Sequence, residues 1–452
     1  MNNIEQDNLM EKLQSLAKRR GFIYQGSEIY GGLAGTWDYG PLGVALKNNI
    51  KESWRKKFVS SRTDMYEVDA AILMNSKVWE TSGHVNTFSD PLVECPKCKN
   101  RYREDQVEKS ADGFLHCSNC DELLGPPRQF NMMFATKIGA MEDSASTVYL
   151  RPETAQGIFV NFKNIVDSFH PKLPFGIAQI GKAFRNEITP RDFIFRVREL
   201  EQMEIEYFVN PAEWEKYFEY LKDEMIDWMG VIGINTDKVH ELNVAKEDLA
   251  HYSDRTIDFE FDFPFGRKEL YGLAYRTDYD LSKHSEGSTI SLAYQDEESK
   301  TKFIPHVIEP SFGVDRTVLA LLASAYTEDS PTEGESLETR VYLKFKPSIA
   351  PVICAVSPLL KNKPELVDKA KFVFGMLKSE FGRVMWDDNG NIGKRYRRQD
   401  EIGTPWCIVI DFDTLGEGGG EMKDTVTIRD RDTGNQERVA ITDLISKIKE
   451  QL

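Results

Sequence analysis

The sequence lacks the features of a membrane-spanning or secreted protein. No apolar run approaches the ~18 residues that cross a bilayer, and residues 1–30 carry charges where a signal peptide would be apolar. We therefore expect a cytoplasmic protein with no membrane partner. At 452 residues the chain is too long for a small disulfide-stapled protein, and its 40% of apolar residues excludes global disorder. Two or three folded cores of ~150 residues each are expected.

The sequence also lacks an overall excess of basic residues. Its 57 Lys and Arg face 73 Asp and Glu, and this formal charge of −16 by itself argues against a polyanionic partner. The acidic excess lies in residues 1–340, with a net charge of −17, whereas residues 341–452 carry +1. A nucleic-acid partner therefore requires that basic residues cluster locally.

No internal repeat or low-complexity tract is present, so domain boundaries must come from local signals. The acidic segment 327–339 contains Pro331 and Gly334, which is typical of a linker and places a boundary near residue 340. Beyond it, helix-like stretches such as 364–381 alternate with strand-like runs such as 406–410. This alternation predicts a separate α/β domain.

Two amphipathic helices and one two-faced strand are predicted before the boundary. Apolar residues recur at every fourth position between Gly40 and Val59, and a second helix is expected with Asn210 as N-cap, Pro211 as first residue and Gly230 as C-cap. Residues 196–207 predict a strand with one apolar face. The charged residues of its other face, which we expect to look into a polar site, are Arg196, Arg198 and Glu204.

Two CxxC motifs, Cys95–Cys98 and Cys117–Cys120, are separated by 18 residues. This spacing can place four thiolates tetrahedrally around zinc, a closed coordination that serves structure rather than catalysis. The polar segment between the motifs is too short for a core of its own, so metal would supply its folding free energy. A pair of disulfides is the weaker alternative in a cytoplasmic chain. We therefore predict a zinc-binding insertion over residues 92–130.

Residues 176–183 nearly match a phosphate-binding GxxxxGK[ST] loop, but Ala183 lacks the hydroxyl group that would hold Mg²⁺ and no helix follows. The residues after it are more informative. Arg185 and Glu187 precede a loop and the charged strand, and two strands joined by a loop can direct several guanidinium groups into one cleft, as activation of a polyphosphate requires. Further on, Glu309–Arg316 ends a strand and begins an apolar helix. The alternative for each of these groups alone is a surface patch of salt bridges.

Taken in order, these pieces resemble the three signature motifs of class II aminoacyl-tRNA synthetases. Motif 1 would be the helix after Pro41 and the strand near Met65–Leu73, motif 2 the Arg185/Glu187 hairpin, and motif 3 the segment Glu309–Arg316. Further runs are similar to class IIa glycyl-tRNA synthetases of the homodimeric type: Trp37–Gly43 (WDYGPLG), Thr81–His84 (TSGH), Arg151–Gly157 (RPETAQG), Gln202–Glu206 (QMEIE) and, in the C-terminal part, Ile392–Trp406.

The resemblance implies a class II catalytic domain over residues 1–340, of the α+β class, with a central antiparallel sheet and a small zinc-ribbon-like insertion. Residues 341–452 would form an α/β anticodon-binding domain. The implied enzyme is a homodimer that binds ATP with Mg²⁺ and a structural Zn²⁺. It activates glycine as glycyl-adenylate and transfers it to the 3′ end of tRNA(Gly), and no general base is required because the attacking carboxylate is already ionised.

The resemblance also assigns site residues. The catalytic residues would be Arg185, which neutralises the α-phosphate, Glu187, and Arg316, which grips the γ-phosphate or covers the adenine. The ATP site would comprise Arg185, Asn186, Glu187, Phe195, Arg196, Val197, Arg198, Glu199, Leu200, Glu269, Leu270, Gly313, Val314, Asp315 and Arg316. The glycine site would comprise Arg103, Glu153, Leu200, Glu201, Gln202, Met203, Glu204, Arg276, Glu309, Pro310, Ser311, Phe312 and Gly313. The tRNA contacts would include Lys394, Arg395, Arg397 and Arg398, and the metal ligands would be Cys95, Cys98, Cys117 and Cys120.

Two positions depart from the family pattern. Leu200 stands where an aromatic residue usually stacks on adenine, and Asp315 replaces the more usual Glu before the motif 3 arginine. Both changes concern ATP affinity, and neither removes a charged group that the chemistry needs. A catalytically inactive tRNA-binding paralogue is the main alternative, disfavoured by the retained charged residues. A zinc-dependent nucleic-acid-binding module would leave most of the chain unexplained.

Overall fold

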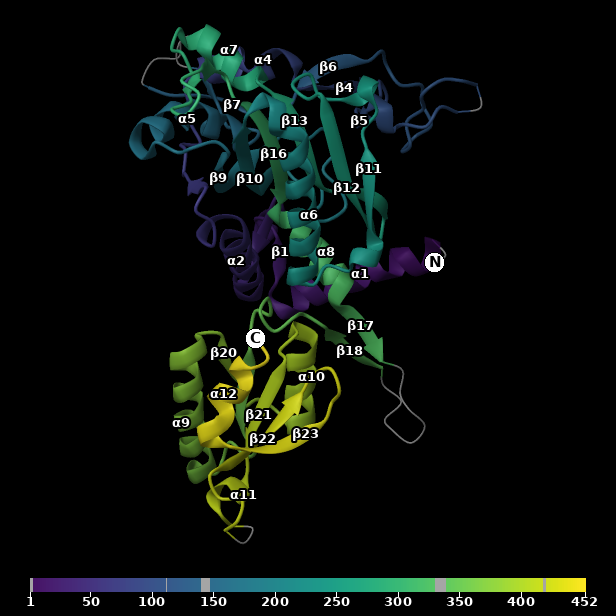
Figure 1. Ribbon diagram of the computed structural model, residues 1–452. Coiled ribbons are helices and arrows are strands. Elements are labelled where there is room, and N and C mark those ends of the chain that lie inside the picture. Colours follow the sequence, from purple (N-terminus) through teal and green to yellow (C-terminus); the bar gives the residue numbers. More distant parts are fainter. Residues whose placement is uncertain (1–2, 111, 140–146, 330–338, 418–419) are drawn as a thin grey trace.

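The computed structural model describes residues 3–110, 112–139, 147–329, 339–417 and 420–452. A large sheet with its flanking helices forms the first part of the chain, and a smaller domain with its own sheet forms the C-terminal part (Figure 1). Among the described residues, no helix combines the length and apolar character that a membrane crossing requires.

The large sheet has seven strands in the order β11-β12-β13-β16-β10-β9-β3. Neighbouring strands are antiparallel, except that β3 at the edge runs parallel to β9. The predicted central antiparallel sheet is therefore confirmed. The strands are β3 (Met65–Glu67), β9 (Phe175–Phe184), β10 (Glu199–Val209), β11 (Val239–Asn243), β12 (Arg255–Phe263), β13 (Gly266–Thr277) and β16 (His306–Gly313).

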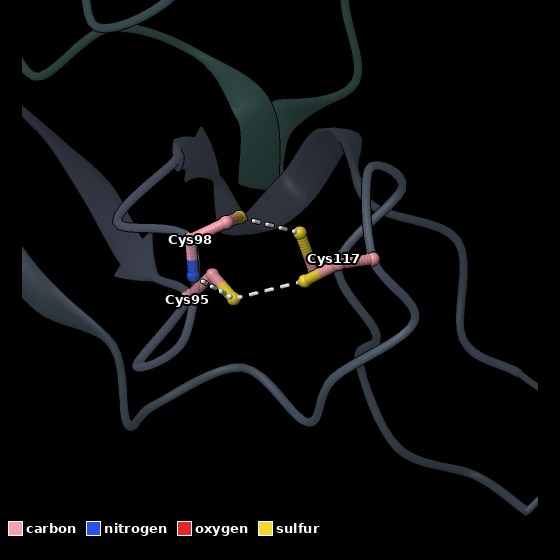
Figure 2. Close-up of side chains that lie close together, drawn as sticks. Cys95, Cys98 and Cys117 are labelled. Carbon is pink, nitrogen blue, oxygen red and sulfur yellow. Dashed lines mark hydrogen bonds between the residues drawn. The ribbon is translucent and has the colours of Figure 1, made fainter.

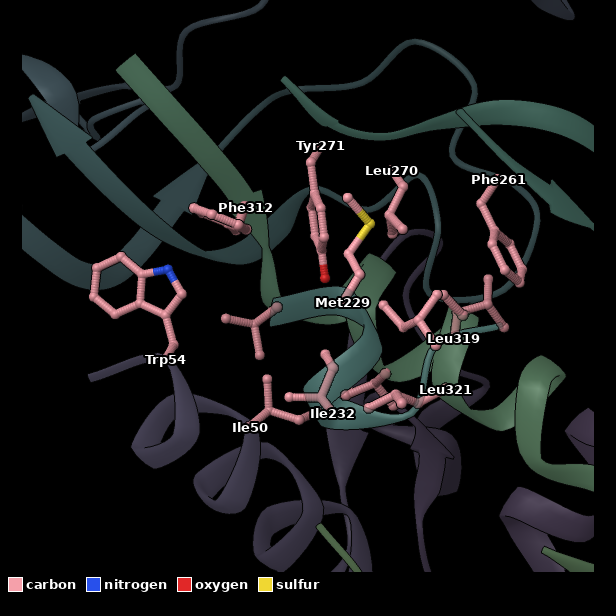
Figure 3. Close-up of a cluster of buried hydrophobic side chains, with 14 of the residues drawn as sticks. Ile50, Trp54, Met229, Ile232, Phe261, Leu270, Tyr271, Phe312, Leu319 and Leu321 are labelled. Atoms are coloured by element: carbon pink, nitrogen blue, oxygen red, sulfur yellow. The ribbon is translucent and has the colours of Figure 1, made fainter. Parts of the chain in front are cut away.

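Helices α2 (Pro41–Arg55), α6 (Trp214–Ile232) and α8 (Val314–Ala325) pack against one face of this sheet and share its largest hydrophobic core (Figure 3). Trp54, Met229 and Phe312 from three different elements meet there. The predicted apolar stripe of α2 is buried, and a π-helical turn over Lys56–Ser60 carries Phe58 into the same core. Helices α5 (Ala155–Phe169) and α7 (Tyr279–Ser288) lie on the other face with a second core.

Two predicted boundaries are wrong in detail, and the predicted N-cap Asn210 is confirmed, although the first turn is 3₁₀ rather than α-helical. Helix α6 continues past Gly230 and is capped by Gly233, whose φ of 92° is readily adopted only by glycine. Asn210 caps a short 3₁₀ helix over Pro211–Glu213 that leads into α6. The charged strand begins at Glu199, so Arg196 and Arg198 lie in the preceding loop. The segment that resembled a phosphate-binding loop is strand β9, as its context indicated.

The predicted insertion is a small three-stranded sheet in the order β5-β4-β6. Its strands are β4 (Ser89–Glu94), β5 (Arg101–Arg103) and β6 (Arg128–Asn131). The other α-helices and strands of the first part are α1 (Asn3–Arg20), α3 (Ser76–Thr81), α4 (His84–Thr87), β1 (Ile23–Gln25), β2 (Trp37–Tyr39), β7 (Ala135–Lys137), β8 (Thr147–Tyr149), β14 (Tyr294–Gln295) and β15 (Lys302–Phe303).

The C-terminal domain has a five-stranded sheet in the order β20-β19-β21-β22-β23, in which β19 is parallel to β20 and β21. Its helices pack on a separate hydrophobic core that begins at Ile353. The predicted helix 364–381 and strand 406–410 are confirmed residue for residue. The elements are β19 (Cys354–Pro358), α9 (Pro364–Phe381), β20 (Val384–Trp386), α10 (Ile392–Ile402), β21 (Trp406–Ile410), α11 (Phe412–Leu415), β22 (Thr425–Asp430), β23 (Gln436–Ala440) and α12 (Leu444–Lys449).

The connection between the two parts differs from the predicted linker. Residues 327–329 belong to β17 (Tyr326–Asp329), which pairs with β18 (Arg340–Leu343), and residues 330–338 lie outside the described residues. After β18 the chain still packs on the first part, because Phe345, Ile349 and Val352 belong to the large core. The large core thus includes residues up to Val352 together with Ile402 of the C-terminal part, and the second core begins at Ile353.

Candidate active site

A cavity of about 260 Å³ opens where the β9–β10 loop meets β13 and the start of α8. Its wall contains many of the residues predicted to bind ATP: Arg185, Glu187, Phe195, Arg196, Val197, Leu200, Glu269, Leu270, Gly313, Asp315 and Arg316. Four others do not line it. Val314 is buried in the large core, Glu199 pairs with Lys182, and Asn186 and Arg198 bond to neighbouring backbone. Motifs 2 and 3 thus meet in one place, as predicted.

Arg316 lies in the first turn of α8 and joins two walls of the cavity. Its Nη1 donates to the backbone oxygen of Glu269 at 3.1 Å and lies 3.0 Å from the Glu269 carboxylate. The charge of Arg316 is the main reason that the pKa of Glu269 is lowered. The guanidinium group also covers the ring of Phe195, which packs on Phe263 and Phe265. Arg316 is thus held at the edge of the cavity.

Arg185 and Glu187 leave unused hydrogen-bonding capacity in the cavity wall. Arg185 donates Nε to the Pro152 carbonyl at 3.1 Å, and its guanidinium group lies over the ring of Phe88. Glu187 Oε2 is buried without a hydrogen-bond partner among the described residues, and so is Nη1 of Arg196, 3.9 Å from it. Because buried polar atoms are nearly always bonded, these groups are suited to a polar ligand.

The two departures from the family pattern have different surroundings. Leu200 lines the cavity, opposite Ala183 in the β9–β10 register. Asp315 accepts bonds from the Tyr39 hydroxyl at 2.6 Å and from the Glu201 backbone at 2.8 Å. Burial and the charge of Asp315 raise the pKa of Tyr39 well above its usual value. Asp315 therefore anchors the start of α8 to β10 and β2.

A cluster of buried carboxyl groups, called the carboxyl pocket below, adjoins this cavity through Ser311, which lines the cavity and donates Oγ to Glu204 at 3.1 Å. The Glu204 carboxylate also accepts from the Thr154 backbone N–H and from Gln202 Nε2, each at 2.8 Å. Burial, followed by the charge of Glu153, raises the pKa of Glu204. Together with the Thr154 hydroxyl group, these contacts make four donors that fix the orientation of the Glu204 carboxyl group.

Glu309 forms the second part of this pocket. Its Oε2 accepts from Arg276 Nη1 at 2.9 Å, and the other guanidinium nitrogens of Arg276 bond to Asp280 at 2.8 and 3.0 Å. Arg276 is 1% exposed and stacks on the ring of Tyr252, 3.7 Å from the centroid. Arg276 and Glu309, which were both predicted for the glycine site, are therefore paired, and Asp280 is a partner that the sequence did not indicate.

Glu153 completes the pocket beside His84, whose Nε2 lies 3.3 Å from Glu153 Oε2. Although burial opposes ionisation, the charges of His84 and Arg276 hold the pKa of Glu153 well below its usual value. Ser82 Oγ lies 2.8 Å from His84 Nδ1 and fixes the ring. His84 had no predicted role, although the TSGH run that contains it was part of the resemblance.

Several residues predicted for the glycine site lie elsewhere. Met203 and Phe312 are buried in the large core on the opposite face of the sheet, because side chains alternate along a strand. The Glu201 carboxylate bonds to Lys47 and Lys51 on α2, at 2.7 and 2.9 Å. Arg103 lines the cavity that contains Arg185 and Arg316, and it pairs with Asp90 at 2.8 Å. Pro310 is buried beside Leu273. The pocket itself is formed by Glu153, Glu204, Arg276, Glu309 and Ser311.

The four predicted zinc ligands converge in the insertion (Figure 2). Their sulfur atoms all lie within 4.8 Å of one another. The Sγ atoms of Cys95 and Cys120 are 3.6 Å apart, and those of Cys98 and Cys117 are 3.4 Å apart. These distances exceed a disulfide bond and suit thiolates that surround one ion. The donor set therefore fits zinc.

The basic cluster on α10 is only partly exposed. Arg395 is 3% exposed, and its guanidinium group donates to the backbone oxygens of Pro358, Asp388 and Gly390. This corrects the prediction that Arg395 contacts tRNA, because its donors already bind the protein. Arg398 pairs with Asp387 at 2.6 Å and is half-buried, whereas Lys394 and Arg397 are exposed.

Comparisons with known proteins agree with this arrangement. The family described as "tRNA synthetase class II core domain (G, H, P, S and T)" matches residues 128–325, and "Anticodon binding domain" matches residues 353–451. The glycine–tRNA ligase of Thermus thermophilus is 47% identical over 98% of this chain and 99% of its own length. The glycine–tRNA ligase of Clostridium acetobutylicum is 48% identical over 99% of this chain and 100% of its own length. The chain therefore belongs to the glycine–tRNA ligase family.

Proposed function

We propose that this protein is a glycine–tRNA ligase that uses ATP to activate glycine and esterifies it to tRNA(Gly). The observation that carries the proposal is the adjacency of two unlike sites. The cavity has Arg185 and Arg316 in its wall, and Ser311 connects it to the pocket of Glu204 and Glu309. The first site suits a nucleoside triphosphate, and the second suits a small ammonium group.

In the first step, the glycine carboxylate attacks the α-phosphorus of ATP and pyrophosphate leaves. We expect Arg185 to neutralise the charge that builds on the α-phosphate and Arg316 to bind the nucleotide, because both residues line the cavity. ATP enters with Mg²⁺, for which Glu187 and Glu269 offer the oxygen donors that this ion prefers. When bound, the ion would neutralise phosphate charge.

Glycine offers no side chain for recognition, so its ammonium group must supply the affinity. Glu153, Glu204 and Glu309 provide charge-assisted acceptors in a pocket that is almost closed to solvent. A larger amino acid would be refused by crowding, since one extra methyl group in a well-packed site costs roughly 1–3 kcal/mol. In the second step, a terminal hydroxyl group of tRNA attacks the activated carbonyl carbon and AMP leaves.

The proposal includes a structural zinc ion on the four cysteines, tRNA contacts through Lys394, Arg397 and Arg398, and a cytoplasmic homodimer. The homodimer is supported by two adjacent, exposed apolar side chains near the N-terminus, because Ile29 is 89% exposed and Tyr30 is 87% exposed. Sedimentation equilibrium should give twice the chain mass of 51.8 kDa. A monomer mass at micromolar concentration would contradict the dimer.

A charging assay tests the function as a whole. The protein should attach labelled glycine to a tRNA(Gly) transcript with ATP and Mg²⁺, and not to a transcript of another tRNA. An inactive paralogue would bind the tRNA without charging it. The intact Arg185, Arg316 and Glu204 environments favour the enzyme over that alternative.

A further inference from the structure

Glu206 is a fully buried glutamate that lies beneath the proposed glycine pocket. It follows Glu204 by two residues on β10, so both side chains lie on the same face of the sheet. Its exposed fraction is 0%, and neither carboxyl oxygen has a hydrogen-bond partner among the described residues. A bare carboxylate in such a place is costly, so the group calls for an explanation.

The register of the sheet places Glu206 beside Glu309. Glu204 is opposite Ser311 and Tyr207 is opposite Ile308 in one unbroken register. Two residues beyond Glu204, Glu206 therefore faces Glu309, which is two residues before Ser311 on β16. On its other side Glu206 pairs with Ile177 of β9, which is apolar. The buried residues of α5, which covers this face, include no ionisable side chain.

The charged groups around Glu206 are therefore Glu309, Glu204, Arg276 of β13 and Asp280 of α7. The guanidinium group of Arg276 is the cation in this set, and its nitrogens are already bonded to Glu309 and Asp280. Glu206 thus has three acidic neighbours, and the cation near it, Arg276, already bonds to two of them.

Burial and the neighbouring charge of Glu309 raise the pKa of Glu206 well above its usual value. Burial also raises the pKa of Glu309, whereas the charge of Arg276 lowers it. The bond from Arg276 favours the ionised form of Glu309, whereas nothing among the described residues bonds to Glu206. Of the two carboxyl groups, Glu206 is therefore the one whose surroundings favour the protonated form.

We propose that Glu206 is a neutral carboxylic acid that positions Glu309 for the amino group of the substrate. Its hydroxyl group donates to the Glu309 carboxylate, which also accepts from Arg276. The pair then carries a single negative charge, held on the residue that contacts the ammonium group. This inference rests on the proposed function, and it makes Glu206 a positioning residue rather than a catalytic one.

Three variants separate this role from a merely structural one. Glu206→Gln keeps the shape and an N–H donor, whereas Glu206→Met keeps much of the volume without a donor and Glu206→Ala removes both. Glycine-dependent exchange of pyrophosphate into ATP gives the KM for glycine, the KM for ATP and kcat. The Gln variant should stay close to wild type in all three constants.

The Met and Ala variants should raise the KM for glycine roughly 10- to 100-fold, as expected for loss of a hydrogen bond to a charged group, with little change in the KM for ATP. A Gln variant as impaired as Ala would show that an ionised carboxylate is needed, and a Met variant equal to wild type would show that Glu206 only fills space. Either result overturns the proposal. Failure of the proposed function would appear instead in the wild-type protein, as exchange that glycine does not drive.

Infrared spectroscopy gives a readout that does not depend on activity. Wild-type protein at neutral pH should show the carbonyl stretch of a buried protonated carboxyl group, and the Glu206→Gln protein should lack it. A wild-type spectrum without this band would contradict a neutral Glu206.

Discussion

The guanidinium group of Arg316 lies over the ring of Phe195, 4.5 Å from its centroid. This pair closes one side of the cavity that we propose for ATP, and Leu200 contributes another part of its wall. Phe195 is itself held against Phe263 and Phe265, at centroid distances of 5.2 and 5.1 Å. An adenine base in this cavity would therefore meet a preformed cation and an aliphatic side chain.

Leu200→Phe should lower the KM for ATP several-fold. A leucine can bury adenine but offers no π-face, and stacking of a base on an aromatic ring is worth roughly 1–3 kcal/mol in other nucleic-acid sites. The KM for glycine should hardly change, because the carboxyl pocket is formed by other residues. Both constants are measured by pyrophosphate exchange. If neither moves, residue 200 does not contact the base.

Arg185→Ala should reduce the rate of adenylate formation by about 10²–10³, as for other removed electrostatic stabilisers. Its guanidinium group lies in the cavity wall beside Glu187. Arg191→Ala is a matched control, because Arg191 is in the same loop and pairs with Asp192 at 3.3 Å on the surface. An exchange rate that falls equally in both variants would indicate damage to the loop rather than loss of a stabilising charge.

The purified protein should contain about one zinc ion per chain, and Cys95→Ser should lose it. Because a short segment with little hydrophobic core depends on its metal, the loss should destabilise mainly residues 92–130. Hydrogen exchange and elemental analysis report the two effects. Cys354→Ala is the control, since Cys354 lies in the C-terminal core. A native, metal-free protein with reduced thiols would refute the assignment.

Lys394→Glu combined with Arg397→Glu should raise the KM for tRNA while sparing glycine-dependent pyrophosphate exchange. Both side chains are exposed on α10. Lys371→Glu, which reverses one exposed charge on α9, controls for the change in charge of the domain. Equal losses in charging and in exchange would point to misfolding instead.

Arg395→Ala should behave differently from its neighbours on α10. It removes a buried guanidinium group that bonds to three backbone carbonyl groups, and loss of buried hydrogen bonds to a charged group costs on the order of several kcal/mol. We expect a lower melting temperature of the C-terminal domain in calorimetry. An unchanged melting temperature with weaker tRNA binding would restore Arg395 as a contact residue.

Local sequence patterns predicted much of the fold, but they could not distinguish between nearby residues of the same type, such as two glycines or two basic residues. The bounds of α9 and β21 follow from their apolar periodicity and flanking residues. Gly230 and Gly233 fit a helix end equally well in the sequence, and packing of the last turn selects Gly233. Lys394 and Arg395 likewise look equivalent until the fold buries one of them.

Local sequence patterns also predicted only part of the candidate site. Motif residues such as Arg185, Glu204 and Arg316 were predicted because their sequence context is specific. His84 acts through a contact with a distant segment, at Glu153, whereas Asp280 pairs with Arg276 only four residues away, where β13 is followed by α7. Glu206 shares the parity of Glu204, and its lack of a partner becomes visible only in the assembled pocket.

Pyrophosphate exchange into ATP, measured with each of the twenty amino acids separately, tests the central claim most directly. A cavity with Arg185 and Arg316 beside a closed pocket of carboxyl groups predicts exchange with glycine and hardly any with alanine or serine. Exchange driven by another amino acid would contradict the assignment of the pocket, and exchange with none would contradict the assignment of the enzyme.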